Sequence, residues 1–181
     1  MIQSNLTVEL ARQLRTDFAL YNFVETGTAW GDTAERGAIM FRAVYTIELG
    51  LKQYVASRRR LAGGQVVCLF GHSPFVLKEV VKWLRGASLF WLDAHYSGGG
   101  TARGPTECPL LAELDAVCGH GHCILIDDAR LFRREVPLNG HRPEDWPTVA
   151  DIEAELCSGE RLYHLPDQIL ITPREYEACL V

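Results

Sequence analysis

Short apolar runs alternate with segments of helical spacing along this chain, and this alternation constrains the fold more than any other feature. The spacing of Leu77, Val80 and Leu84, for example, is typical of the buried stripe of an amphipathic helix. Continuous apolar strands separated by helices indicate a parallel sheet that is covered on both faces. The five predicted strands are residues 21–26, 43–49, 65–71, 88–93 and 122–128.

The C-terminal part of the chain breaks this alternation. Residues 161–173 predict two short strands joined at Pro166-Asp167, which we expect to form an antiparallel edge of the sheet. The predicted fold class is therefore α/β, with three α/β/α layers and a doubly wound, mainly parallel sheet that ends in this hairpin. No internal repeat, low-complexity tract or linker is present, so we expect a single domain over residues 1–181.

Three helix starts carry capping signals. Asp32 with Glu35 predicts a capping box, as does Thr148 with Asp151. Ser73, followed directly by a proline, predicts an N-cap with proline at the first helical position.

The composition, 48% apolar and 23% charged, is ordinary for a globular protein. The net charge of −5 gives no long-range attraction for nucleic acid or an anionic membrane, so we expect neither as a partner. The N-terminus does not resemble a signal peptide, and no apolar run approaches the ~20 residues of a membrane span. The six cysteines form no CxxC pair and no zinc-type spacing, which favours a reduced, cytoplasmic protein without structural zinc.

Ionisable residues and glycines follow the predicted parallel strands where each strand ends. The carboxyl ends of parallel strands meet at one edge of a sheet, where such folds bind ligands. A purely structural domain would scatter these residues over its surface. The set comprises Glu25, Gly27 and Gly31, then Glu48, then His72 and Ser73, then Asp93 and His95, and finally Asp127 and Asp128.

The first strand-to-helix turn reads ETGTAWG, in which Gly27 and Gly31 allow a tight turn and close approach of a ligand. The spacing differs from the G-x-G-x-x-G of dinucleotide sites, so a pyrophosphate is not clearly expected. Glu48 ends the next strand about 20 residues on, where an acidic side chain binds ribose hydroxyls in nucleotide sites. Together these features favour a nucleoside-containing cofactor.

Four motifs, FVETGTAWGDTA, VYTIELG, LFWLDAHYSGG and ILIDDARLF, occur in this order. In order and spacing they resemble the class I, Rossmann-like S-adenosylmethionine-dependent methyltransferases, over roughly residues 20–175. Within that class, the chain resembles the metal-dependent O-methyltransferases of the macrocin and cephalosporin-biosynthesis type. This closer resemblance lies in Asp93 at the end of its strand and in the Asp127-Asp128 pair.

The resemblance implies S-adenosylmethionine as cofactor, with the glycine turn beside its methionine part and Glu48 on its ribose. The 71–73 turn would lie beside the adenine, although the acidic residue that commonly stands near His72 is missing. The chain also lacks the N-terminal helices and insertions that often build a substrate lid, so either the site is open or a second subunit of a homo-oligomer closes it. The implied cofactor-binding residues are Glu25, Gly27, Thr28, Gly31, Glu48, Leu49, His72 and Ser73.

Asp93, Asp127 and Asp128 follow strands expected to be adjacent, so their carboxylates can converge. Uncompensated, such charges repel, and a divalent cation would resolve this; oxygen ligands suit Mg²⁺, Ca²⁺ or Mn²⁺. The metal would lower the pKa of a substrate hydroxyl, with His95 as a candidate general base.

Simpler roles for the same side chains stay open. Asp127 would then only cap a turn, and Asp93 would contact cofactor or substrate without a metal. His95 would only form a hydrogen bond across the glycine-rich loop.

Residues 97–104, SGGGTARG, predict a mobile loop that lets substrate approach the backbone. Arg103 on this loop would either hold an anionic substrate group or remain solvated. Among the aromatic residues, Trp83 and Trp91 are expected in the core, and Trp30 and Tyr96 are the better candidates for ligand contact, with packing as the alternative.

The predicted function is S-adenosylmethionine-dependent, metal-assisted O-methylation of a small hydroxylated molecule, a sugar or glycosylated metabolite. A first alternative is a metal-dependent hydrolase or lyase on the same fold, which would use Asp93, His95 and Asp128. A second is a catalytically degenerate subunit that binds a partner.

Overall fold

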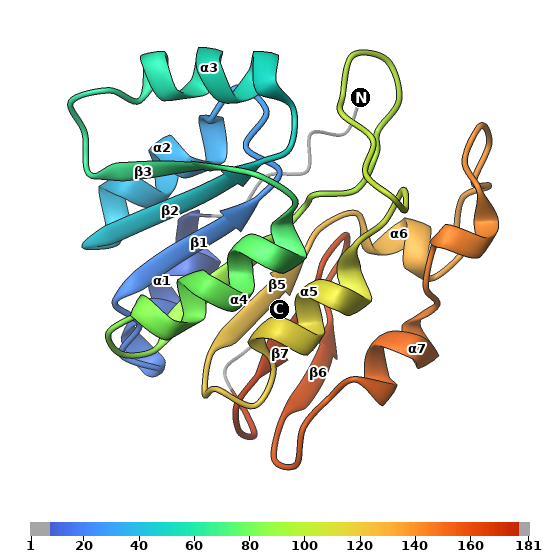
Figure 1. The fold of residues 1–181 in the computed structure, drawn as a ribbon. Helices are drawn as coiled ribbons and strands as arrows, with labels where there is room; N and C mark the ends of the chain where they lie inside the picture. The colour runs from blue at the N-terminus through green and yellow to red at the C-terminus, as the bar shows by residue number, and fades with distance from the viewer. Residues whose placement is uncertain (1–7, 178–181) are drawn as a thin grey trace.

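Seven strands of the part of the chain that the structure describes form one twisted sheet at the centre of the molecule (Figure 1). The structure, a computed structural model, describes residues 8–177. The strand order is β3-β2-β1-β4-β5-β7-β6, in which neighbours among β1 to β5 are parallel while β7 is antiparallel to both β5 and β6. The predicted parallel sheet with an antiparallel C-terminal hairpin is therefore confirmed. The strands are β1 (Asn22–Thr26), β2 (Ala43–Glu48), β3 (Val66–Phe70), β4 (Ser88–Leu92), β5 (Cys123–Ile126), β6 (Arg161–His164) and β7 (Ile169–Thr172).

Helices cover both faces of this sheet and bury its apolar side chains in two clusters. On one face, Leu14 of α1 and Ala34 of α2 pack with Phe23 and Leu89 of the sheet. The other face is covered by α4, α5 and α7. The sequence analysis did not predict α1. The helices are α1 (Val8–Asp17), α2 (Asp32–Met40), α3 (Leu51–Arg60), α4 (Ser73–Trp83), α5 (Leu110–Val117), α6 (Ala129–Phe132) and α7 (Val149–Ala154), with a 3₁₀ turn η1 (Pro143–Asp145).

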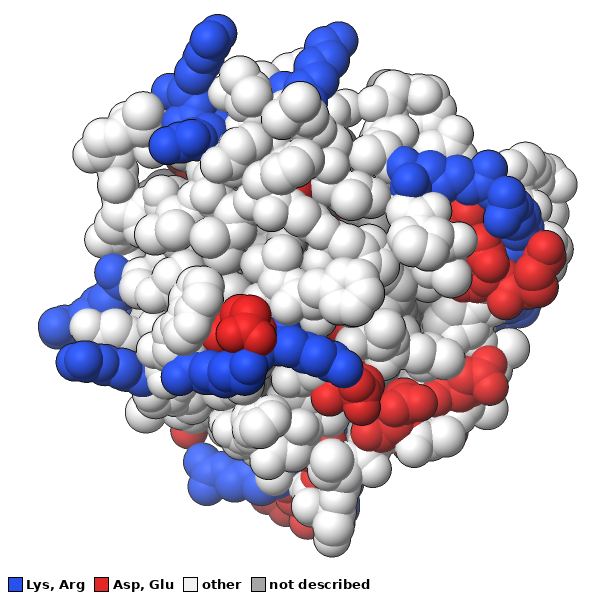
Figure 2. Space-filling model, in the orientation of Figure 1, with Lys and Arg blue, Asp and Glu red and all other residues white. Residues whose placement is uncertain are grey.

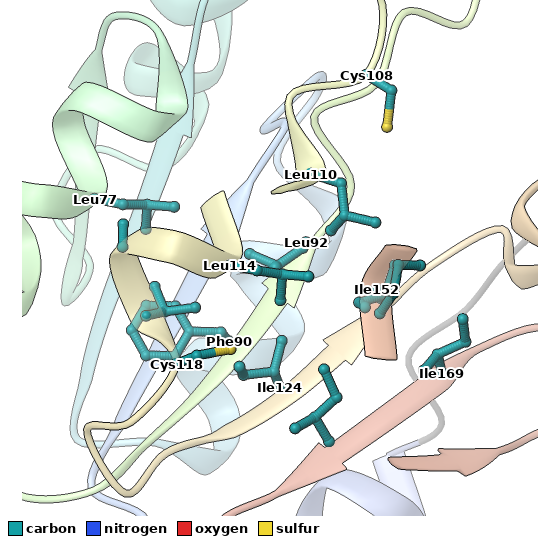
Figure 3. Packing of buried hydrophobic residues seen from close by; sticks show 14 of the residues in the cluster. Leu77, Phe90, Leu92, Cys108, Leu110, Leu114, Cys118, Ile124, Ile152 and Ile169 are labelled. Atoms are coloured by element: carbon teal, nitrogen blue, oxygen red, sulfur yellow. The ribbon is translucent and has the colours of Figure 1, made fainter. Parts of the chain in front are cut away.

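The larger cluster lies between α5 and the middle of the sheet (Figure 3). Leu114 of α5 lies against Leu92 and Ile124, and Ile152 of α7 extends the same layer. Each of these side chains is almost fully buried. Strands buried on both faces need apolar residues at every position, which is why β4 and β5 appear in the sequence as continuous apolar runs.

Strand β3 forms one edge of the sheet and is only partly covered. Val67 and Phe70 on it are exposed, as is Phe75 at the start of α4. In Figure 2, charged side chains lie around the margin and across the lower middle of the visible face, and the area above them is mostly uncharged. Trp83 at the end of α4 is 54% exposed, so its predicted core position is wrong, whereas Trp91 is buried as predicted.

Two of the three predicted helix starts differ in detail. Gly31, with a left-handed backbone, caps α2, and no side-chain cap forms. Asp32 and Glu35 instead pair with Arg60 at the end of α3, at 2.6 and 2.7 Å. This long-range ion pair replaces the predicted capping box, because one guanidinium satisfies both carboxylates.

Helix α4 begins one residue earlier than predicted. His72 is its N-cap, and Ser73, predicted as the cap, is already its first helical residue. The capping box of α7 is confirmed, since Thr148 Oγ1 accepts from the backbone N–H of Asp151 and the Asp151 carboxylate accepts from that of Thr148.

None of the helices within residues 8–177 is both long enough and apolar enough to cross a membrane. The cysteines in this part of the chain form no disulfide, and Cys179 lies outside the described residues. These cysteines are Cys68, Cys108, Cys118, Cys123 and Cys157.

Candidate cofactor pocket and active site

A pocket opens beyond the carboxyl ends of the parallel strands, where the sequence placed its polar set. The loops that follow β1, β2, β3 and β4 all contribute to its wall, the last of them with its glycine-rich part before α5. Residues far apart in the sequence are therefore brought to one site by the sheet order. The predicted site residues that line the pocket are Gly27, Glu48, Leu49, His72, Ser73, Asp93 and His95.

Gly27 lies where the backbone following β1 passes closest to the backbone following β4. Its φ of 81° is in the left-handed region, and a Cβ at this position would lie 2.1 Å from the carbonyl oxygen of Asp93. Its N–H donates to the carbonyl of Ile47 at 2.9 Å, which joins the β1 turn to β2 as well. Only glycine satisfies both the backbone conformation and this close contact.

Glu25 and Thr28 lie behind the pocket wall and not on it. Thr46 of β2 donates to Oε2 of Glu25 at 2.5 Å, and the Thr28 hydroxyl lies 2.6 Å from that of Thr46. Because Thr46 has a single hydroxyl proton, Thr28 is the donor in the second contact. Burial raises the pKa of Glu25 to about 8, with further contributions from the charges of Asp93 and Glu48. Gly31 is likewise outside the pocket lining; it caps α2 against Leu61.

Glu48 is buried at the end of β2 and lines the pocket. Its Oε2 accepts from the backbone N–H of Ala29 at 2.9 Å, and its Oε1 accepts from that of Gly50 at 2.6 Å. These bonds fix the carboxylate between the glycine turn and the start of α3. Each oxygen keeps further acceptor capacity toward the pocket.

His72 and Ser73 form the wall at the start of α4. Burial lowers the pKa of His72, whose ring lies within 5.5 Å of the Phe75 ring. Behind them, Glu113 of α5 is buried, and burial raises its pKa to about 7 although hydrogen bonds from Ser73 and Thr26 lower it. The sequence analysis did not include Glu113. The sequence feature that could have identified Glu113 is its position three residues after Leu110, which puts a charged residue on the apolar stripe of a helix.

Asp93, His95 and Asp128 form a compact group beside the pocket. His95 Nε2 lies 3.3 Å from Oδ1 of Asp93 and 2.9 Å from Oδ2 of Asp128. One nitrogen or oxygen atom from each of the three residues lies within 4.8 Å of the others. Asp128 has a left-handed φ of 56°, a conformation that non-glycine residues rarely adopt outside functional sites or turns.

Asp127 is not part of this group. Its buried carboxylate accepts from the Nε2 of Gln168, which lies just before β7, at 3.2 Å. Two of the three predicted metal ligands thus lie together with His95, and the third points to the β7 side. Neighbouring residues at a strand end point in different directions, so the sequence pair Asp127-Asp128 does not act as one unit.

Opposite charges balance the carboxylates of this group. Arg130 Nη1 lies 2.7 Å from Oδ1 of Asp128. Burial raises the pKa of Asp128, but His95 and Arg130 outweigh it and hold the pKa below its usual value. Burial lowers the pKa of His95, yet Asp128 and Asp93 raise it above its usual value. Burial raises the pKa of Asp93 to about 7, against the opposing charge of His95. Asp128 and His95 therefore favour an ion pair, while Asp93 can gain or lose a proton near neutral pH.

The glycine-rich loop closes one side of the pocket. Gln53 of α3 donates to the carbonyl of Gly100 at 2.6 Å, and Ser97 and Thr101 line the pocket. Arg103, proposed from the sequence as an anion ligand, pairs instead with Glu107 at 2.5 Å. Of the two aromatic residues expected at the ligand, Trp30 is 59% exposed and Tyr96 packs under Arg103 and beside His141; neither lines the pocket.

Comparison with known proteins adds to this geometry. No family model and no curated protein sequence matches the chain. Solved structures do: the SAH-bound methyltransferase PaMTH1 from Podospora anserina has a TM-score of 0.66 at 19% identity, over 97% of this chain and 80% of that one. SAM-bound TomG, an O-methyltransferase of tomaymycin synthesis from Streptomyces achromogenes, has a TM-score of 0.63 at 15% identity, over 94% and 82%.

A third similar structure is SAM-bound CalS10 from Micromonospora echinaspora, an amino pentose methyltransferase of calicheamicin biosynthesis. Its TM-score is 0.63 at 15% identity, over 92% of this chain and 88% of that one. This chain has the class I methyltransferase fold. The fold implied by the sequence motifs is thereby confirmed, and at these identities the likeness concerns the fold, so the chemistry follows from the site.

We predict that Gly27→Ala destabilises the protein and disrupts the pocket, because the new Cβ would overlap the carbonyl of Asp93. Gly98→Ala is the matched control: its φ is also 81°, but no atom lies within 4 Å of the added Cβ. Thermal unfolding of both variants measures the difference. Equal losses of stability would show that backbone conformation matters and that the contact with Asp93 does not.

We predict a pH-dependent gain in stability for Glu25→Gln. Between pH 4.5, its ordinary pKa, and about 8, Glu25 ionises in the unfolded chain but keeps its proton in the folded one. The wild-type protein therefore loses stability from this residue as the pH rises through that window, by about 1.4 kcal/mol per unit at most. Denaturant unfolding at several pH values should show that the free energy of unfolding of the variant increases relative to that of wild type from pH 5 to 8. A constant difference would contradict the assignment.

Proposed function

We propose that the protein transfers a methyl group from S-adenosylmethionine to a hydroxyl group of a small molecule. The observation that carries the proposal is a pocket in which Gly27, Glu48 and Asp93 meet at the carboxyl ends of three adjacent parallel strands. The class I methyltransferase fold and the SAM- or SAH-bound state of the similar structures support it.

The residues of the pocket suit the parts of the cofactor. Glu48, already fixed by two backbone N–H groups, would accept hydrogen bonds from the ribose hydroxyls through its remaining lone pairs. Leu49 and His72 would lie against the adenine, and Gly27 would leave room for the methionine part. The residues that line the pocket include the carboxyl groups of Glu48 and Asp93 and neither a lysine nor an arginine, which favours a positively charged sulfonium over the neutral thioether product.

The cofactor supplies an electrophilic methyl group when it is bound. The acceptor hydroxyl must lose its proton as its oxygen forms the new bond to carbon and the sulfur–carbon bond breaks. His95, held by Asp93 and Asp128, is placed to take that proton. To do so, its imidazole must first give up its own proton, for which Asp93, with a pKa of about 7, is a better acceptor than Asp128, which lies nearer but whose pKa is lowered.

We also propose a divalent cation at Asp93, His95 and Asp128. For an ion held at about 2.1 Å, adjacent ligand atoms lie about 3 Å apart, close to the 2.9 and 3.3 Å found here. The fit revises the ligand set predicted from the sequence, since His95 replaces Asp127. One imidazole with two carboxylates favours Mn²⁺ over Mg²⁺ or Ca²⁺, which prefer oxygen ligands alone. The ion would polarise the acceptor hydroxyl.

A sugar or a glycosylated metabolite is our proposed acceptor class. The support is chemical: a hydroxyl group is what His95 and a bound cation can activate. CalS10, with the same fold, is described as an amino pentose methyltransferase. We further propose that the protein acts in the cytoplasm, as the unpaired cysteines among the described residues suggest, and that it acts on neither nucleic acid nor membranes.

Calorimetric titration with S-adenosylhomocysteine tests the cofactor assignment. Wild type should bind, and Glu48→Ala should bind roughly 10- to 100-fold more weakly, because hydrogen bonds to a charged group are lost. Glu79→Ala, which removes an exposed carboxylate on α4, is the control and should leave binding unchanged. Absence of binding by wild type at millimolar ligand would rule out the proposed function.

Titration with Mn²⁺ at several pH values tests the metal assignment. The ion must displace protons from His95 and Asp93. At pH values below the pKa values of these groups, the affinity for Mn²⁺ should therefore rise with pH, by up to about tenfold per pH unit for each displaced proton. Asp128→Asn should abolish this binding, and Asp115→Asn, on the exposed face of α5, should not. If wild type binds no Mn²⁺, or Asp128→Asn binds it equally well, the three residues do not form a metal site.

A further inference from the structure

Glu107, a buried carboxylate outside the pocket, connects the two chain segments that enclose His95. Its side chain is 1% exposed. It lies in the yellow-green loop before α5, while its partners come from the orange segment between α6 and α7 and from the glycine-rich loop (Figure 1). The sequence analysis did not include it, because nothing in its local pattern distinguishes it from a solvated loop residue.

The two oxygens of Glu107 together contact four nitrogen groups. Oε2 accepts from the backbone N–H of Arg142 at 2.8 Å and from the indole Nε1–H of Trp146 at 3.2 Å. The same oxygen lies 3.2 Å from Nδ1 of His141, and Oε1 accepts from Arg103 at 2.5 Å. Burial raises the pKa of Glu107, but these hydrogen bonds outweigh it, so the pKa is lowered and the group stays charged.

The backbone of Glu107 adds two further bonds. Its N–H donates to the carboxylate of Asp145 at 3.0 Å, which strengthens the connection to the orange segment. Its carbonyl accepts from the N–H of Tyr96 at 2.7 Å, directly beside His95. One residue therefore fixes both the main chain next to His95 and the segment that covers it.

Trp146 is the element of that segment that contacts His95. Its ring is buried, with its centroid 5.1 Å from that of the His95 imidazole and the planes tilted by 51°. Two further aromatic rings, those of Phe132 and His141, pack against the indole. The imidazole is thus held between the indole on one side and the carboxylates of Asp93 and Asp128 at its Nε2.

The glycine-rich loop gives His95 little support of its own. A Cβ added at Gly98, Gly99 or Gly100 would meet no atom within 4 Å, and a side chain from outside the loop, Gln53, donates a hydrogen bond to the carbonyl of Gly100. Besides the carboxylates at Nε2, the imidazole contacts Trp146, and its backbone directly precedes that of Tyr96; Glu107 holds both of these residues.

We propose that Glu107 is a positioning residue for His95, which it orients by holding the Trp146 indole against the imidazole and the backbone of Tyr96 beside it. The catalytic meaning of this orientation rests on the proposed function. The contacts themselves do not.

Nuclear magnetic resonance of histidine-labelled protein tests the proposal without a methyl acceptor. Glu107→Gln removes the charge, so a neutral amide oxygen in place of Oε2 holds the N–H groups of Trp146 and Arg142 more weakly, while the NH₂ group faces Arg103 and cannot accept. The ring signals of His95, assigned by their loss in His95→Gln, should be single in wild type. They should shift and broaden in Glu107→Gln, as the imidazole samples further orientations.

Controls separate this effect from a general loss of structure. The ring signals of exposed His120 and His164 should stay sharp in the same sample, and Glu144→Gln, on the same orange segment, should leave His95 unchanged. Unchanged, sharp His95 signals in folded Glu107→Gln would overturn the proposal. If that variant does not fold, Trp146→Phe tests the proposal instead, because it keeps an aromatic ring but removes the N–H from which Glu107 accepts a hydrogen bond.

Calorimetry with S-adenosylhomocysteine on the same variants distinguishes the two proposals. Glu107→Gln should bind this ligand with wild-type affinity, since Glu107 does not line the pocket. Loss of that binding along with the His95 signals would assign Glu107 a purely structural role and overturn the proposal. If wild type does not bind S-adenosylhomocysteine, only the proposed function is contradicted. The comparison of the His95 signals would still test the role of Glu107.

Discussion

The close pairing of β1 with β4 at the centre of the sheet is the constraint on which the site depends. It brings Gly27 so near the backbone of Asp93 that no side chain fits between them. The acidic strand end of β4 therefore lies directly beside the glycine turn that follows β1. The neighbouring strands β2 and β5 add Glu48 on one side and Asp128 on the other. A pocket for a nucleoside and a polar reaction centre thus share one edge of the sheet because the strands are parallel.

Charge balance decides what the reaction centre can do. Three carboxylates were expected to need a cation, but the structure brings His95 between Asp93 and Asp128 and adds Arg130. The group is thereby balanced by side chains of the protein itself. A divalent ion would have to replace the proton of His95, so metal binding and protonation compete for one nitrogen atom. The same geometry accommodates a histidine base without metal and a metal site at higher pH.

Most of the fold followed from local patterns, whereas the errors arose from long-range contacts. The parallel strands were predictable because strands buried on both faces are continuously apolar. Helix α1 was missed, since its few buried residues, Ala11 and Leu14, lie in a mostly polar segment. The capping box at Asp32 failed because Arg60, distant in sequence, competes for its carboxylate. In the site, local sequence placed the strand ends correctly but not the directions of their side chains, so His95 was expected as a base or in a hydrogen bond across the glycine-rich loop, and its ion pair with Asp128 was not predicted. Asp128, which pairs with His95, has a left-handed backbone that the sequence did not indicate.

A crystal structure with S-adenosylhomocysteine and Mn²⁺ bound would test the central claim most directly. The account predicts the ribose on Glu48, the thioether sulfur between Gly27 and the Asp93–His95–Asp128 group, and anomalous density for manganese within that group. A nucleoside bound elsewhere, or a sulfur atom remote from Asp93 and His95, would contradict the claim that one edge of the sheet holds both cofactor and reaction centre.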